Sequence, residues 1–157
     1  MKRLLASLLF SLAAVCGFSA SARAEVAVAI VVHPEASVGE LSMDQLRRIF
    51  LAEQQFWDDN SRITLLVSAP GALERSLVLD LIYQMDENQF RQYWIAKMFR
   101  AEVPSGPKIV FSTNMAIDLV TAINGSITFV NASALTTDAR VIPIDGLLPN
   151  DEGYPLK

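Results

Sequence analysis

Apolar residues occur along this chain in two patterns, as short unbroken runs and as longer stretches with helical spacing. An unbroken run falls at residues 26–32 (VAVAIVV), and two further runs, each interrupted only by one threonine, fall at residues 63–67 (ITLLV) and 127–130 (ITFV). Runs of this length that are rich in β-branched residues are typical of strands buried on both faces of a sheet. Two shorter strands are predicted at residues 109–111 and 140–144. The second is expected at a sheet edge, because Pro143 has no N–H to donate to a neighbouring strand.

Four stretches with apolar residues three or four positions apart predict helices. The first begins at Ser42, because Gln45 three residues later completes a capping box, and Arg47 and Arg48 are expected to point outward. The other three span about residues 72–84, 87–100 and 112–123. The predicted buried faces are Leu46, Ile49 and Phe50 in the first helix; Leu73, Leu77, Val78, Leu81 and Ile82 in the second; Phe90, Trp94, Ile95 and Met98 in the third; and Met115, Ala116, Leu119, Val120 and Ile123 in the fourth.

The alternation of strands with helices predicts an α/β fold, with a mixed or parallel sheet covered by helices on both faces. From residue 147 onward the chain shows no periodicity, and this tail is expected to lie along the surface. The chain after residue 24 has a length that suits one domain rather than two.

Residues 1–24 have the features of a secretory signal peptide. A basic start precedes an apolar run, and the sequence Ala-Arg-Ala at residues 22–24 suits a cleavage site. Cleavage after Ala24 predicts a periplasmic domain of residues 25–157 that is not inserted in the membrane. The alternative is a lipoprotein acylated at Cys16, but Val15 stands where such signals place a small residue.

Charge and composition exclude several classes of function. Removal of residues 1–24 would change the formal net charge from −4 to −7, which argues against nucleic acid as a partner. The only cysteine would leave with the signal peptide, so no disulfide is expected. His33 is the only histidine and lacks partners at metal-ligand spacing, so no metal site is expected. No nucleophile motif, P-loop or dinucleotide fingerprint occurs in the sequence. We therefore expect that the protein is not an enzyme and has no cofactor.

Two segments that lead from a strand into a helix are the candidate binding residues. Strand ends that feed helix N-termini are where open α/β folds bind anions, because the first backbone N–H groups of a helix have no partner within it. Arg75, in the first turn of its helix, would add a cation; the alternative is an ordinary solvated surface charge. The alternative for Ser68 and Ser112 is that they only form a turn or cap a helix. The candidate ligand-binding residues are Ser68, Gly71, Arg75, Ser112, Thr113 and Asn114.

The order of these segments resembles the phosphate-binding proteins of ABC transporters, a branch of the type II periplasmic solute-binding fold. The similar segments are residues 41–67 (LSMDQLRRIFLAEQQFWDDNSRITLLV), 90–99 (FRQYWIAKMF), 112–130 (STNMAIDLVTAINGSITFV) and 141–156 (VIPIDGLLPNDEGYPL). The resemblance covers nearly all of residues 26–157 and implies a single lobe of that fold, with phosphate as the ligand.

Three departures from the family bear on binding. Full-size relatives have two lobes, and this chain matches only the second. The anion loop expected after the second strand reads Ser-Ala-Pro-Gly-Ala at residues 68–72, and Thr128 and Phe129 stand in place of a Gly-Tyr pair.

Two functional hypotheses remain. The first is a periplasmic solute-binding-like protein that recognises phosphate or a related small oxyanion without catalysis. Its affinity would be weak unless the protein forms a homodimer or docks on a partner. The second is a lobe that has lost ligand binding and acts as an interaction module with an envelope protein. The missing lobe and the altered loop favour this second hypothesis.

Overall fold

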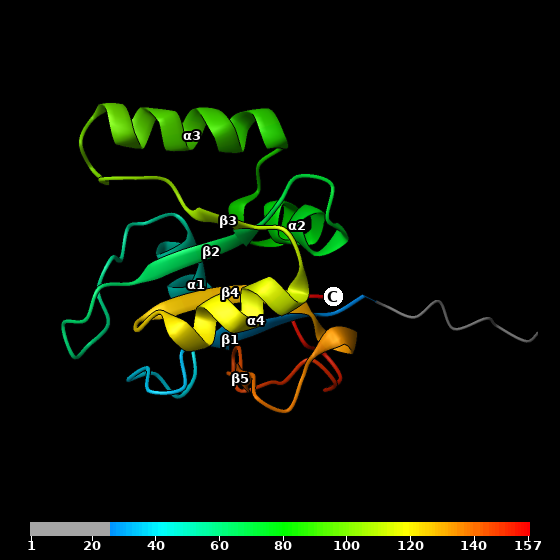
Figure 1. Ribbon diagram of the computed structural model, residues 1–157. Coiled ribbons are helices and arrows are strands. Elements are labelled where there is room, and N and C mark those ends of the chain that lie inside the picture. Colours follow the sequence, from blue (N-terminus) through cyan, green and yellow to red (C-terminus); the bar gives the residue numbers. More distant parts are fainter. Residues whose placement is uncertain (1–25) are drawn as a thin grey trace, which may run out of the picture.

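A computed structural model describes residues 26–157, in which strands and helices alternate along most of the chain (Figure 1). The strands are β1 (Val28–Val32), β2 (Thr64–Ser68), β3 (Lys108–Val110), β4 (Ser126–Asn131) and β5 (Arg140–Val141). The helices are α1 (Met43–Phe50), α2 (Leu73–Val78), α3 (Glu87–Phe99) and α4 (Thr113–Ala122), with a π-helical turn η1 (Leu79–Tyr83) and a 3-10 turn η2 (Ala132–Ala134). None of these helices has the length and apolarity to cross a membrane. The predicted signal peptide and Cys16 lie outside the described residues.

The five strands form one mixed sheet in the order β3-β2-β4-β1-β5. Strand β2 runs parallel to β3 and β4, whereas β1 runs antiparallel to β4 and β5. The predicted α/β class with a mixed sheet is therefore confirmed. Strand β5 lies at an edge, as expected from Pro143, but it is shorter than the predicted residues 140–144.

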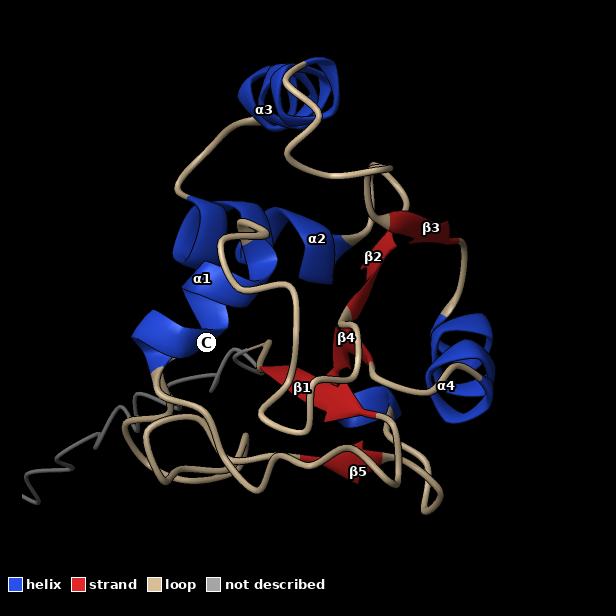
Figure 2. Ribbon diagram, turned by 90° about the vertical axis from the view of Figure 1, so that its left-hand side faces the viewer, coloured by secondary structure: helices blue, strands red, loops and turns tan. Residues whose placement is uncertain are grey.

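Helices cover both faces of the sheet, and β1 contributes to the core on each side (Figure 2). Alternate residues of a strand point to opposite faces. Val28, Ile30 and Val32 accordingly pack with α1, η1 and the buried face of α3, while Ala29 and Val31 pack with α4. All five β1 residues are fully buried, which explains why this strand reads as an unbroken apolar run.

The predicted helix over residues 72–84 is interrupted. It consists of α2 followed by the π-helical turn η1, and Gln84 ends it in the left-handed conformation with φ of 54°. The last carbonyls of a helix have no partner within it. Arg47 supplies one here, because its Nε donates to the Ile82 carbonyl at 3.0 Å and its Nη2 to the Leu81 carbonyl at 3.3 Å. The prediction that Arg47 points into solvent was therefore wrong.

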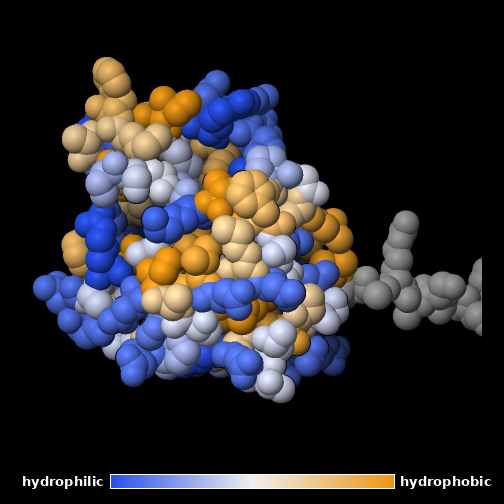
Figure 3. All heavy atoms as spheres, viewed as in Figure 1, coloured by the Kyte–Doolittle hydropathy of each residue, from blue (hydrophilic) through white to orange (hydrophobic). Residues whose placement is uncertain are grey.

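The buried face of α3 differs from the predicted one. Phe90, Trp94 and Lys97 are buried, whereas Ile95 is 55% exposed and Met98 is 41% exposed. Positions four and seven residues after Phe90 lie within about 40° of it on a helix with 100° per residue, but Ile95 lies about 140° away. The prediction was wrong for Ile95 and Met98 because α3 has apolar residues on more than one face. Figure 3 shows apolar atoms at the surface over this helix.

The C-terminal tail is not a surface segment, contrary to the prediction. Tyr154 and Leu156 are buried in the same core as Val28. The Val28 N–H donates to the Leu156 carbonyl at 2.8 Å, and the Tyr154 hydroxyl donates to the Val28 carbonyl at 2.8 Å. The tail has no periodicity because individual contacts hold it, namely two buried side chains and a backbone hydrogen bond, and not a regular element.

Replacing Leu156 by Ala should lower the free energy of unfolding by about 2–4 kcal/mol, because it leaves a cavity in the core beside β1. Leu148→Ala is the matched control, since Leu148 is 43% exposed in the same tail and its loss should cost less than about 0.5 kcal/mol. Urea denaturation measures both. Equal effects of the two substitutions would show that the tail does not belong to the core.

Candidate functional site

The carboxyl ends of the neighbouring strands β2 and β3 bring the two candidate segments together. Ser68 and Val110 are paired in the parallel register, and the Ala69 N–H donates to the Val110 carbonyl at 2.8 Å. The chain leaves β2 at Ser68 and continues into α2. Beside this point it leaves β3 at Val110 and continues through Ser112 into α4. We call this end of the sheet the carboxyl edge.

The start of α4 is capped by Ser112, as the sequence predicts, and has backbone N–H groups without an acceptor in the helix. Ser112 is its N-cap, and the Ser112 Oγ accepts a hydrogen bond from the Met115 N–H at 3.1 Å. The first intrahelical bond runs from Ala116 to the Ser112 carbonyl, so the N–H groups of Thr113 and Asn114 have no acceptor within the helix. Ser112 and Asn114 are exposed and Thr113 is half-buried. These groups can therefore be reached from solvent.

The start of α2 already has an anion of its own. Its N-cap, Ala72, provides no side-chain hydrogen bond, and Gly71 before it is exposed with φ of 92°. The Glu74 carboxylate lies in the first turn, where the helix dipole stabilises negative charge, and its Oε1 accepts from the Ser68 hydroxyl at 3.3 Å. An incoming anion at Ser68 would have to compete with this carboxylate.

Arg75 is a buried structural group and not a solvated surface charge. Its side chain is almost wholly enclosed, and its guanidinium donates from Nε and Nη2 to the two carboxylate oxygens of Glu87 at 2.6 and 2.8 Å. The Arg75 Nη1 donates to the Ser68 carbonyl at 2.7 Å, and its guanidinium carbon lies 4.7 Å from the centre of the Phe90 ring. The hydrogen bond from Arg75 lowers the pKa of Glu87 below its ordinary value. Arg75 therefore ties the end of β2 to the start of α3.

Neither Glu74 nor Glu87 was predicted from the sequence to belong to this region. Glu74 was visible as a first-turn acidic residue, which is a common helix feature by itself. Glu87 is twelve residues from Arg75, and only the turn through η1 brings the two together. Sequence spacing does not predict such a contact.

The other polar residues singled out in the sequence have local partners. The His33 Nδ1 accepts from the Glu35 N–H at 3.1 Å, and an Asp59 carboxylate oxygen accepts from the Ser61 N–H at 2.8 Å. Trp57 and Trp94 are buried in the core. Within residues 26–157, no three His, Cys, Asp or Glu side chains are grouped so as to hold a metal ion.

Comparison with known proteins identifies the fold. No family model and no curated protein matches the sequence. Three solved structures are similar. They are an ABC-type phosphate transport receptor from Vibrio cholerae (16% identity, 79% of this chain and 48% of that chain, TM-score 0.63), a putative phosphate ABC transporter substrate-binding protein with bound phosphate from Clostridium perfringens (14%, 79% and 47%, 0.63), and PstS from Borrelia burgdorferi (16%, 83% and 54%, 0.66).

The described chain therefore has the fold of one lobe of the periplasmic binding proteins. It spans about half the length of the solved structures that it matches. At these identities the similarity establishes the fold alone. Whether the six candidate residues bind a ligand stays a prediction.

Replacing Glu87 by Gln should lower the free energy of unfolding at pH 7 by about 1–3 kcal/mol. The buried Arg75 guanidinium would lose its anion, but the Glu87 side chain is 46% exposed, so water replaces part of the interaction. A carboxyl group whose folded-state pKa is lowered contributes stability above its unfolded-state pKa of about 4.3, and this is lost as the pH falls through the folded-state value. The difference between variant and wild type should therefore narrow as the pH falls from 7 toward 3.

Urea titrations across that pH range measure this difference. Glu152→Gln is the control, because Glu152 is exposed and forms no salt bridge among the described residues. A loss of stability in Glu87→Gln that is the same at every pH would contradict the assigned ion pair.

Proposed function

We propose that this protein is a periplasmic solute-binding-like domain that recognises a small oxyanion, phosphate in the first instance, without catalysis. The observation that carries this proposal is the pairing of the two strand ends at the carboxyl edge, which sets the start of α4 beside the loop before α2. The fold supports it, since the similar solved structures include a phosphate transport receptor and a substrate-binding protein with bound phosphate.

In this proposal the Ser112–Asn114 segment provides the main contacts. The N–H groups of Thr113 and Asn114 donate to the anion, and the hydroxyl of Ser112 lies beside them. Gly71 has no side chain, so the neighbouring loop can approach the ligand closely. Ser68 joins the site when the Glu74 carboxylate turns away from it. Arg75 contributes by fixing Ser68 through the 2.7 Å bond to the Ser68 carbonyl, and not as a free cation.

The affinity should be weak. The charge of Arg75 is neutralised by Glu87, and Glu74 places a negative charge at the mouth of the site. The remaining donors are backbone N–H groups and hydroxyls, which act through local dipoles. We expect the affinity for phosphate to be no tighter than a dissociation constant of about 1 mM. This corresponds to roughly −4 kcal/mol of binding free energy, which is a reasonable limit for so few contacts.

Ser112→Asp should abolish phosphate binding while keeping the helix intact, because Asp is as good an N-cap as Ser but repels an anion. Glu74→Gln should strengthen phosphate binding about threefold to tenfold, because it removes the competing carboxylate. Isothermal titration calorimetry with phosphate measures both effects. Ser37→Ala is the control, since Ser37 is an exposed serine in the loop after β1, and β1 runs antiparallel to β4, so this loop lies at the other end of the sheet from the carboxyl edge.

Phosphate affinity that is unchanged in Ser112→Asp would place the anion elsewhere and refute the assigned site. If wild type and Glu74→Gln both give no heat at tens of millimolar phosphate, the oxyanion proposal fails, and the second hypothesis from the sequence, an interaction module, takes its place.

A further inference from the structure

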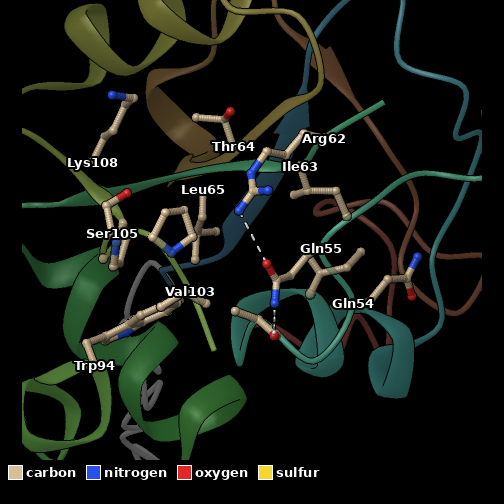
Figure 4. A pocket seen from close by; sticks show the side chains of 15 residues that line it. Gln54, Gln55, Arg62, Ile63, Thr64, Leu65, Trp94, Val103, Ser105 and Lys108 are labelled. Carbon is tan, nitrogen blue, oxygen red and sulfur yellow. Dashed lines mark hydrogen bonds between the residues drawn. The ribbon is translucent and has the colours of Figure 1, made fainter. Parts of the chain in front are cut away.

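A separate pocket lies at the opposite end of β2 from the carboxyl edge (Figure 4). It is enclosed by the start of β2, by the loop after α1, by the loop before β3, and by Trp94 of α3. Its volume is about 130 Å³, which is room for roughly four water molecules at about 30 Å³ each. The pocket is therefore large enough for a small organic molecule.

The charged residues that line this pocket are both cations, Arg62 and Lys108. No carboxylate is among its lining residues, although the protein as a whole has a formal net charge of −4. Glu102, which is adjacent in sequence to the lining residue Val103, has its carboxylate paired with Lys97 and Arg100. The Glu102 backbone carbonyl accepts a hydrogen bond from the side chain of the lining residue Gln55 at 3.0 Å.

The two cations keep donors available for a ligand. Arg62 Nη2 donates to the Gln55 side-chain oxygen at a long 3.3 Å, and Figure 4 shows its guanidinium lying between Gln55 and the start of β2. Within residues 26–157, neither Arg62 nor Lys108 forms a salt bridge. This is the reverse of the carboxyl edge, where Arg75 is neutralised by Glu87.

The remaining residues that line the pocket are partly polar and partly apolar. Thr64 and Ser105 are polar residues of the lining, whereas Leu65, Val103 and Trp94 are apolar ones. The Trp94 indole N–H is buried and has no hydrogen-bond partner among the described residues. A ligand that fits both sides carries a negative head and a short apolar tail.

We propose that this pocket is a binding site for a small aliphatic carboxylate. The planar guanidinium fork of Arg62 matches the geometry of a carboxylate, while the amino group of Lys108 points outward at the rim in Figure 4 and contributes at longer range. The short apolar tail lies against Leu65 and Val103. An inorganic oxyanion would satisfy the cations but leave that apolar surface unfilled. The site is independent of the proposed phosphate site, which lies at the other end of β2.

Butyrate is the probe, and the two tryptophan indoles are the reporters in ¹H–¹⁵N NMR spectra. The Trp94 N–H signal should shift with butyrate in a saturable way, with a dissociation constant of about 1–10 mM. The Trp57 N–H should respond less, since it donates at 2.9 Å to the Gly125 carbonyl, which also accepts from the lining residue Thr64 at 3.2 Å. The Ala139 backbone N–H is the internal control, because it precedes β5 at the opposite edge of the sheet from β3, so its signal should stay in place.

Arg62→Gln should weaken butyrate binding about tenfold and Lys108→Gln about twofold to threefold, because the Lys108 amino group acts only at longer range. Arg91→Gln, an equal charge change at an exposed position outside the pocket, should not weaken it. Arg62 and Lys108 are exposed, so folding should survive both substitutions. Ser112→Asp should leave butyrate binding unchanged, which separates this site from the proposed phosphate site.

Three results would overturn the proposal. They are a Trp94 signal that does not shift or does not saturate with butyrate, an affinity equal to wild type in Arg62→Gln, and inorganic phosphate moving the Trp94 signal at lower concentration than butyrate does.

Discussion

The structure depends on one buried strand. β1 is the only described strand that is antiparallel to its neighbours on both sides, and each of its five residues is fully enclosed. Because its side chains alternate between the two faces, β1 takes part in both hydrophobic cores. The tail fixes its first residue, since Val28 bonds to Leu156 through its N–H and to Tyr154 through its carbonyl. With no disulfide available among the described residues, this burial and these backbone bonds hold the sheet together.

The placement of carboxylates distinguishes the two ends of β2. At the carboxyl edge the chain supplies its own anions, Glu74 to Ser68 and Glu87 to Arg75, so the donors left for a ligand are those at the start of α4. At the opposite end Arg62 and Lys108 have no such partner among the described residues. The proposed anion site is thus one of low charge, whereas the pocket at Arg62 has cations without a carboxylate partner among the described residues.

The fold was largely predictable from the sequence, because buried strands and capped helices leave local signals. The run at residues 26–32 and the capping box of Ser42 with Gln45 both correspond to observed elements. The tail was not predictable, since Leu156 is buried by contacts with residues more than a hundred positions away. The exposed face of α3 was misread because Ile95 and Met98 are as apolar as the buried residues beside them. For the candidate site, the sequence indicated the cap at Ser112, but the contact of Arg75 with Glu87 and the pocket at Arg62 arise only from the folded chain.

Binding of a small oxyanion at the start of α4, as proposed above, is tested by mapping backbone amide shifts in ¹H–¹⁵N spectra during a phosphate titration. The largest saturable shifts are expected at Thr113 and Asn114, with smaller ones at Gly71, and little change at Thr64 or Lys108. Shifts that are absent at Thr113 and Asn114, or that are centred on the pocket at Arg62, would contradict it.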